Sequence, residues 1–204
     1  MKIEILSQNK QEVKFAVKEI NAAFANELRR IMMSEVPTMA VEWVDFKKND
    51  SSLPDELMAN RIGQIPLTFD KKAYNFHENC DNCKGKGCSR CQVELVLKKK
   101  GPGVVYSGDM KSKAKDVQPV FDKIPIVEIF EGDDLQFEAI AQLGIGRKHA
   151  KWQAAVVGYK SEGDAFIFNV EPVCGIAPED IVMYAVDALE EKASEFGKLL
   201  GKLK

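Results

Sequence analysis

Four of the five cysteines lie in one short segment, CDNCKGKGCSRC, and their spacing is typical of a metal site. Cys80 and Cys83 form one C-x2-C pair, and Cys88 and Cys91 form a second. Two intervening residues place both sulfur atoms of a pair on the same side of the backbone, so each pair can contribute to binding one metal ion. Four thiolates suit tetrahedral zinc. The sequence therefore predicts a zinc (Zn2+) site in a loop at residues 80–91.

The same four thiolates leave an iron–sulfur cluster open as the alternative cofactor. We favour zinc because cluster-binding segments more often separate the fourth cysteine from the others or follow it with proline. A catalytic zinc ion is not expected, since four sulfur ligands leave no open position for water or substrate. Cysteines gathered in one loop also suit metal ligation in a reducing compartment better than a disulfide framework. The site is predicted to be structural.

The other residues that could do chemistry do not form a catalytic group. Asp133 and Asp134 lie in EGDD between two strand-like runs, where Gly and Asp are the expected turn residues. No further acidic cluster supports a two-metal centre. His77 and His149 have no Ser or Cys nucleophile at a suitable spacing, and we expect His149 to be structural. No catalytic residue is predicted.

The segment LGIGRKHAKW combines a glycine pair with a cluster of basic residues. Gly144 and Gly146 lack the third glycine and the capped helix of a phosphate-binding loop, so the phosphate signal is weak. Arg147, Lys148 and Lys151 could contact an acidic partner or a nucleic-acid backbone, although such a cluster is more often a solvated loop. The sequence leaves the role of this segment open.

The elements that carry these residues begin with a hairpin and a helix. The alternating apolar runs Ile3–Ile5 and Val13–Val17, separated by the polar stretch Ser7–Gln11, predict a β-hairpin. Asn21 can then cap a helix that ends before Pro37. The apolar residues of this helix follow the i, i+4, i+7, i+8 pattern of one face, at Phe24, Leu28, Ile31 and Met32.

A second, longer helix is predicted from Pro178 onward. Glu179 and Asp180 in its first turn and lysines near its far end both suit the helix dipole. Its apolar face extends for about 30 Å at 1.5 Å per residue. The residues of this face are Ile181, Ala185, Leu189, Ala193, Phe196 and Leu200. A small domain does not cover so long a stripe, so we predict a partner there; the alternative is a helix buried in the chain's own core.

The sequence between the two helices predicts a β-rich second domain. After the strand-like run Val41–Phe46 the composition becomes polar in NDSSLPDE, so we place a domain boundary near Asp45. A short helix is predicted at Pro54–Ile62, followed by the strand-like runs QVELVL, PGVVYSG, IPIVEI and LQFEAIAQL. Further on, AAVVGY and AFIFNVEPV flank the polar turn Ser161–Asp164 and predict a second hairpin.

The charge balance excludes several classes of protein. Among 204 residues, 29 are Lys or Arg and 31 are Asp or Glu, which gives a net charge of −2 and lacks the basic excess of a DNA-binding domain. Little or no direct DNA contact is therefore expected. No run approaches the roughly 20 apolar residues that span a bilayer, and the first residues lack the apolar region of a signal peptide. We expect a cytoplasmic protein without membrane contact.

The segment FANELRRIMMSEVPTMAV, from Phe24 to Val41, closely resembles a motif of the RNA polymerase assembly subunits. This family includes the archaeal D-type assembly polypeptides, the N-terminal domain of bacterial alpha and the eukaryotic third-largest subunit. In the motif, a helix carrying L-R-R precedes a proline and a strand of small residues. The runs DELMANRIGQIPL, GPGVVYSGDM, IPIV and GRKHAKWQ follow in the order of the archaeal members, so the resemblance covers nearly the whole chain.

The resemblance implies an α+β fold with a discontinuous dimerisation domain, residues 1–44 and 155–204. A β-rich domain carrying the metal-binding loop, residues 45–154, is inserted into it. In the family, helices corresponding to residues 22–35 and 178–200 pack against a smaller subunit, called L in archaea. This pair forms a platform for the large catalytic subunits. The implied partner-interface residues are Phe24, Leu28, Arg29, Arg30, Ile31, Ile181, Leu189, Phe196 and Leu200, with the two arginines as contacts to the large subunits.

Two departures from the family pattern matter. Many archaeal members carry a ferredoxin-like iron–sulfur domain after KWQ, whereas this sequence has only the turn Ser161–Asp164 there. The cysteine loop lies where the eukaryotic counterpart has a zinc loop, and this shared position favours zinc, although the spacing between the cysteines differs. The usual G-R-G-K pattern is replaced by Gly144-Ile145-Gly146-Arg147, which puts the contact of the first arginine in doubt.

The resemblance implies a non-catalytic assembly subunit of DNA-dependent RNA polymerase that pairs with subunit L. The alternative function is a zinc-dependent protein-binding module, because C-x2-C-x-G-x-G resembles the repeat of DnaJ-like chaperones. Only one such repeat occurs here, where that family uses several. An independent enzyme is disfavoured because no acid/base or nucleophile cluster is present in the sequence.

Overall fold

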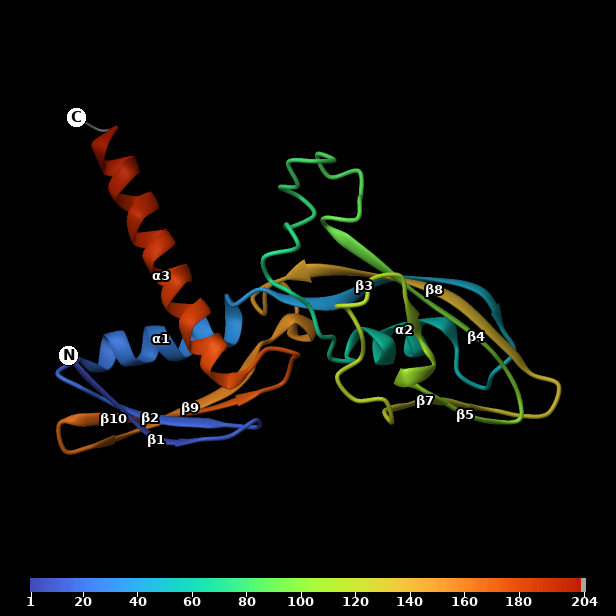
Figure 1. The fold of residues 1–204 in the computed structure, drawn as a ribbon, viewed down its shortest axis with the longest axis horizontal. Helices are drawn as coiled ribbons and strands as arrows, with labels where there is room; N and C mark the ends of the chain where they lie inside the picture. The colour runs from blue at the N-terminus through green and yellow to red at the C-terminus, as the bar shows by residue number, and fades with distance from the viewer. Residues whose placement is uncertain (203–204) are drawn as a thin grey trace. The chain divides into compact units, whose positions relative to one another are not determined.

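The computed structural model describes residues 1–202 and divides the chain into two compact units. Among these residues, 1–37 and 145–202 form the first unit, which we call unit 1, and residues 38–144 form the second, unit 2. The last two residues of the predicted dimerisation domain, 203 and 204, lie outside the described part. Helices and antiparallel sheets occur in both units, which confirms the predicted α+β class (Figure 1).

Unit 1 contains a four-stranded antiparallel sheet made of two hairpins. Its strands are β1 (Lys2–Gln8), β2 (Val13–Lys18), β9 (Ala155–Glu162) and β10 (Ala165–Pro172), in the order β1-β2-β10-β9. Both predicted hairpins are confirmed, because β1 pairs with β2 and β9 with β10. The central pair joins β2 to β10 and stacks the rings of Phe15 and Phe168, whose centroids are 5.0 Å apart. These central strands supply the sheet side of the core of unit 1.

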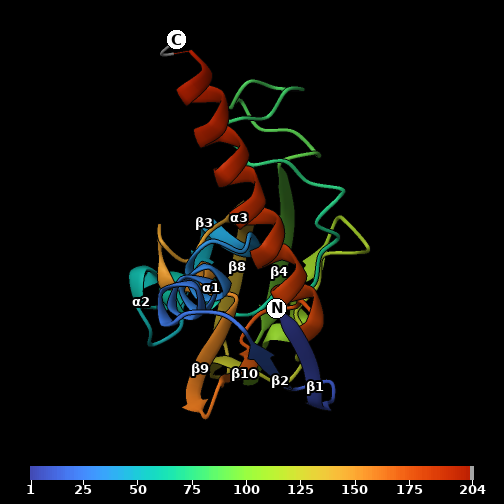
Figure 2. The ribbon, with the colours of Figure 1, turned by 90° about the vertical axis from the view of Figure 1, so that its left-hand side faces the viewer.

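Two helices cover one face of this sheet: α1 (Ala22–Ser34) and α3 (Pro178–Gly201). The Asn21 side chain caps α1 as predicted, accepting a hydrogen bond from the Phe24 backbone N–H at 2.8 Å. Pro178 begins α3, and the helix continues beyond α1 and the sheet, so that its last turns stand clear of the other elements of unit 1 (Figures 1 and 2). None of the described helices is both long enough and apolar enough to span a membrane.

Unit 2 is built around a second four-stranded sheet. Its strands are β3 (Thr38–Asn49), β8 (Asp134–Gly144), β4 (Gln92–Lys100) and β6 (Lys111–Ser112), hydrogen-bonded in that order. The helix α2 (Asp55–Gly63) and a two-stranded sheet, β5 (Gly103–Tyr106) and β7 (Pro125–Ile129), complete the core. Short 3-10 helices occur in both units, at Ser107–Asp109 in unit 2 and Ala150–Trp152 in unit 1.

The structural division differs from the predicted domain boundaries. The chain divides at 37/38 and 144/145, whereas the sequence placed the boundaries after residues 44 and 154. The physical reason is that β3 is one continuous strand, paired with β8 from Thr38↔Gly144 to Asn49↔Leu135. The polar segment NDSSLPDE begins only at Asn49, the last residue of β3, so it follows the hydrogen-bonded ladder and does not divide it. Strand pairing therefore assigns the whole of β3 to unit 2.

Candidate functional site

The four clustered cysteines converge on one point in unit 2. The Sγ–Sγ distances are 3.7 Å for Cys80–Cys88, 3.6 Å for Cys83–Cys91 and 3.8 Å for Cys88–Cys91, and all four sulfur atoms lie within 4.8 Å of one another. A tetrahedral ion with zinc–sulfur bonds of about 2.3 Å requires sulfur–sulfur distances of about 3.8 Å. The cluster therefore fits one four-coordinate metal ion. A multi-iron cluster fits less well, because its thiolates bind different iron atoms and lie further apart.

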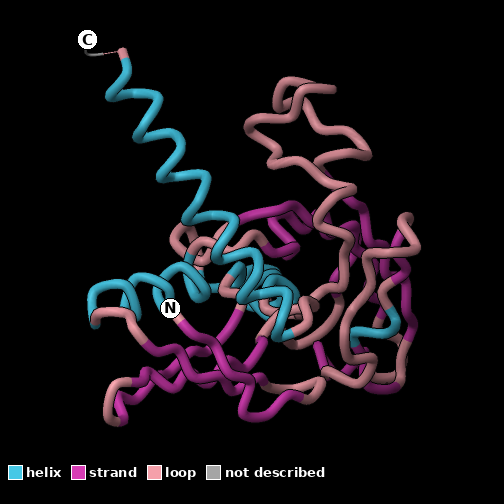
Figure 3. Tube along the Cα trace, turned by 60° about the vertical axis from the view of Figure 1, so that its left-hand side comes forward, coloured by secondary structure: helices cyan, strands magenta, loops and turns pink. Residues whose placement is uncertain are grey.

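The loop that holds these cysteines has no helix or strand between residues 70 and 91 (Figure 3). Its shape comes from tight turns, in which the Lys84 N–H donates to the Cys80 carbonyl oxygen at 2.8 Å. Gly85 and Gly87 have φ angles of 81° and 93°, a left-handed conformation that glycine adopts without strain. The Gly87 N–H also points at Cys83 Sγ, at 3.3 Å. Local chain geometry thus directs the sulfur atoms inward.

The thiols of this cluster are in different electrostatic environments. A hydrogen bond from the Asn82 side chain lowers the pKa of Cys88 to about 6, because it favours the charged form of this thiol. Burial raises the pKa of the Cys91 thiol to about 12, because the charged form lacks water. A bound cation deprotonates such a thiol outright. Cys88 therefore loses its proton more readily than Cys91.

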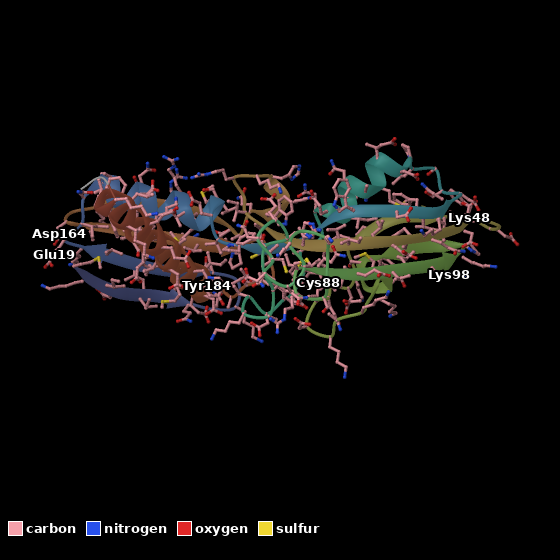
Figure 4. All side chains as sticks on the ribbon, turned by 90° about the horizontal axis from the view of Figure 1, so that it is seen from above. Glu19, Lys48, Cys88, Lys98, Asp164 and Tyr184 are labelled. Atoms are coloured by element: carbon pink, nitrogen blue, oxygen red, sulfur yellow. The ribbon has the colours of Figure 1, made fainter. Side chains whose placement is uncertain are left out.

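The sequence did not assign a role to His77, which the fold brings to the cluster. Its Nδ1 lies 3.6 Å from Cys91 Sγ, 14 residues further along the chain. Ring nitrogens next to metal ligands orient those ligands and tune their basicity. Cys80 and Cys91 are buried and Cys83 is half-buried, so the site opens to solvent on one side; Figure 4 labels Cys88 in this loop.

The predicted partner-interface residues divide into two groups. Leu28, Ile31 and Ile181 are only 5%, 0% and 0% exposed and lie in the core of unit 1 with residues of β2 and β10. These three side chains stabilise the chain's own fold instead of facing a partner. An amphipathic pattern alone does not distinguish an internal core from an interface, because both bury the same residue types.

The second group remains accessible. Phe196 is 64% exposed and Leu200 48%, Phe24 is exposed near the start of α1, and Leu189 is half-buried against the core. All residues from Glu190 to Lys202 are exposed. We call the exposed apolar side chains in this part of the helix the α3 surface; they are Phe196, Leu199 and Leu200. Leu199 was not part of the sequence prediction.

The two arginines of the L-R-R motif differ in their surroundings. Arg29 is half-buried, and its guanidinium donates to Asn26 Oδ1 and contacts Met33 Sδ, both at 3.3 Å. Arg30 is exposed. Arg29 is therefore held along its own helix, whereas Arg30 points to solvent.

An exposed apolar strip on β1 was also missed. Ile3 and Ile5 are 62% and 56% exposed, although they pair with Val17 and Phe15, which are buried under the helices. Directly opposite residues of an antiparallel pair share one face of the sheet. Ile3 and Ile5 therefore lie on the helix side of the sheet where the helices of unit 1 do not cover it. An apolar alternation predicts a buried face, and nothing in the sequence signals that the cover is missing.

The remaining candidates are structural. Asp133 lies in a turn, where its carboxylate accepts a hydrogen bond from the Phe130 N–H at 2.8 Å, in agreement with the predicted turn. His149 accepts a hydrogen bond from the Lys151 N–H at 3.1 Å and packs edge-on against Trp152. Lys151 Nζ also lies 4.4 Å from the centroid of the Trp152 ring. The basic cluster is thus organised around a buried tryptophan.

A protein-family model described as the RNA polymerase Rpb3/RpoA insert domain matches residues 44–158. The chain belongs to this family. Relatives named DNA-directed RNA polymerase subunit Rpo3 are 43% identical over 176 residues in Methanosarcina acetivorans and 44% identical over 162 residues in Pyrococcus furiosus. These alignments cover 86% and 78% of this chain, but only 66% and 59% of the relatives. The chain therefore spans roughly three fifths to two thirds of the length of these relatives.

Proposed function

We propose that this chain is an assembly subunit of DNA-directed RNA polymerase that contributes no catalytic residue of its own. The family match and the names of the relatives support membership of that complex. The cysteine that has a histidine beside it, Cys91, belongs to the cysteine cluster, and that cluster suits a closed, structural metal site. As a polymerase subunit in an archaeal-type cell, it would act in the cytoplasm.

The observation that carries this proposal is the exposed C-terminal half of α3. Phe196, Leu199 and Leu200 are large apolar side chains left in water on a helix whose first half is packed into unit 1. Contiguous exposed apolar surface of this kind is typical of protein–protein interfaces. The exposed Ile3 and Ile5 of β1 add apolar area on the helix side of the same unit. Unit 1 therefore offers a surface for another polypeptide.

The partner proposed for this surface is the smaller polymerase subunit, L. A partner helix lying along α3 would bury Phe196 and Leu200, in the manner of amphipathic helices that join through their apolar faces. The exposed Arg30 is the better placed of the two motif arginines for a contact to a large subunit, because Arg29 is occupied along its own helix. Both contacts are structural and neither requires chemistry.

The proposed cofactor is one zinc ion in the cysteine loop. Bound by Cys80, Cys83, Cys88 and Cys91, it would cross-link a segment that has no regular secondary structure and so stiffen it. The sulfur–sulfur distances support a single four-coordinate ion over a multi-iron cluster. Metal analysis of protein purified under reducing conditions tests this: we expect about one zinc per chain, and iron with sulfide would refute it.

Co-expression with an archaeal L subunit tests the assembly function directly. We expect a one-to-one complex in size-exclusion chromatography with mass detection, while the same chain expressed alone remains free to self-associate or precipitate. A chain that stays monomeric and soluble beside L at micromolar concentration would refute the proposed function. The DnaJ-like alternative predicts that the chain suppresses aggregation of unrelated unfolded proteins. The matched family and the reported relatives are polymerase subunits and give that alternative no support.

A further inference from the structure

A charged clamp joins three separate parts of unit 1. Glu35 follows the last residue of α1, and its side chain is only 11% exposed. One carboxylate oxygen, Oε1, is bonded to the guanidinium of Arg147, and the other, Oε2, lies 2.5 Å from Nζ of Lys192 on α3. A carboxylate removed from water to this extent requires paired cations, because an unpaired buried charge is strongly destabilising. Both oxygens are satisfied here.

The segment that delivers Arg147 is fitted closely to the end of α1. The Arg147 backbone N–H donates to the Ser34 carbonyl oxygen at 2.8 Å, which satisfies one of the free carbonyl groups at the helix C-terminus. A Cβ atom at Gly146 would lie only 2.6 Å from the Met33 carbonyl oxygen. Gly146 is thus required for this close approach. The glycine pair that looked like a weak phosphate-binding signal instead brings a cation to Glu35.

The third member of the clamp lies where α3 leaves the body of unit 1. Leu189 is the last α3 residue that packs partly against the core, and every residue from Glu190 to Lys202 is exposed. Within residues 1–202, the pair of Glu35 and Lys192 is the outermost ion pair observed between α3 and the rest of the unit. This ion pair thus lies beyond Leu189, where the apolar contact between α3 and the core of unit 1 ends.

We propose that Glu35 is a positioning residue that fixes the direction of the exposed half of α3 and so pre-orders the α3 surface for its partner. Without the pair, the helix beyond Leu189 would be held only by its own backbone hydrogen bonds and would bend and fray more freely. Ordering a surface before binding lowers the entropy lost on association. The effect on pairing rests on the proposed function, whereas the effect on α3 does not.

Hydrogen exchange in the isolated full-length chain tests the clamp. In Glu35→Gln, which keeps the side-chain shape but removes the charge, we expect amides of residues 188–196 to exchange roughly tenfold faster. Lys192→Met should reproduce this change in α3 and leave the amides of residues 145–149 protected, because Arg147 still pairs with Glu35. Lys192→Arg keeps a cation beside Glu35, so the amides of α3 should remain as protected as in the unaltered chain. Lys198→Met is the matched control, since it removes a lysine of the same helix for which no ion pair is observed among residues 1–202, and it should change nothing.

Unchanged exchange of residues 188–196 in both Glu35→Gln and Lys192→Met would overturn the proposal. Circular dichroism and thermal melting of each variant identify any variant that fails to fold. If Glu35→Gln fails to fold, Lys192→Met still decides the test, because Lys192 lies on the exposed part of α3. Binding to L should weaken about three- to tenfold in the two clamp variants and recover in Lys192→Arg. If the unaltered chain does not bind L, the proposed function fails, and the exchange data still decide whether the clamp exists.

Discussion

The cysteine loop of unit 2 and the C-terminal half of α3 in unit 1 both lack an apolar core to stabilise them, and they differ in what can take its place. Neither region packs its side chains into a core of its own. The loop brings the sulfur atoms of Cys80, Cys83, Cys88 and Cys91 within 4.8 Å of one another, so a single ion could cross-link it. The α3 surface has no such internal closure, and Phe196 and Leu200 remain in water. Under the proposed function, a metal ion would complete unit 2, whereas a second polypeptide would complete unit 1.

The largest expected effect is a loss of stability, and it distinguishes a core residue of unit 1 from a residue of the partner surface. Leu28→Asp places a charge in a site that is 5% exposed and surrounded by apolar side chains, so we expect a loss of roughly 4 kcal/mol in the free energy of unfolding. Urea denaturation of the isolated chain measures it. A variant that keeps wild-type stability and loses only partner binding would contradict the assignment of Leu28 to the core.

The next effect concerns the loop alone. Cys88→Ser removes one of four ligands, and we expect zinc affinity to fall at least about a hundredfold, as measured by competition with a chromogenic chelator. Cys174→Ser is the control, because Cys174 lies in unit 1 outside the cluster, and it should leave the metal content unchanged. Binding to L should persist in both variants. If removing the metal abolished binding to L, the two regions would not be independent, because the α3 surface would then depend on the cysteine loop.

The third effect concerns α3 alone. Phe196→Asp should weaken binding to L by about tenfold to a hundredfold while the melting temperature stays the same, because this side chain is 64% exposed in the isolated chain. Met183→Asp is a matched control: Met183 is 60% exposed on the same helix but lies roughly 140° around it, at 3.6 residues per turn. Surface plasmon resonance distinguishes the two. Equal losses in both variants would place the partner on a different face of α3.

The smallest effect is a pH dependence at the base of the cysteine loop. Burial, together with a hydrogen bond to Asp116, raises the pKa of Tyr74 to about 12, above its ordinary value of 10.0. The neutral phenol is therefore favoured by the folded state, and its contribution is complete below pH 10 and is lost as the pH rises towards 12. We expect Tyr74→Phe to cost about 1 kcal/mol at pH 7 and to flatten the decline in stability between pH 10 and 12. An equally steep decline in Tyr74→Phe would exclude Tyr74 as its source.

Features that depend on neighbouring residues were predictable from the sequence. The ligand set of the loop follows from two C-x2-C pairs and the glycines between them, because twelve residues with these turns can place four sulfurs only in a small volume. Both hairpins of unit 1, the Asn21 cap of α1 and the start of α3 at Pro178 were predicted for the same reason: alternation, turn residues, a capping side chain and a first-turn proline act within a few positions.

Other features were set by contacts between distant segments. The sequence presented Leu28 and Phe196 as members of similar apolar faces, and only the packing of α1 and α3 against β2 and β10 decided that one is buried and the other exposed. The unit boundary moved to Thr38 because β3 pairs with β8 along its whole length.

The sequence by itself thus determined the cysteine cluster, the hairpins, the two helices and the family motif, since these depend on the order of residues over short distances. Tertiary structure alone decided which apolar side chains remain uncovered and how Glu35, Arg147 and Lys192 meet. Burial and ion pairing depend on where the folded chain brings distant segments together, and no local pattern of residue types carries that information.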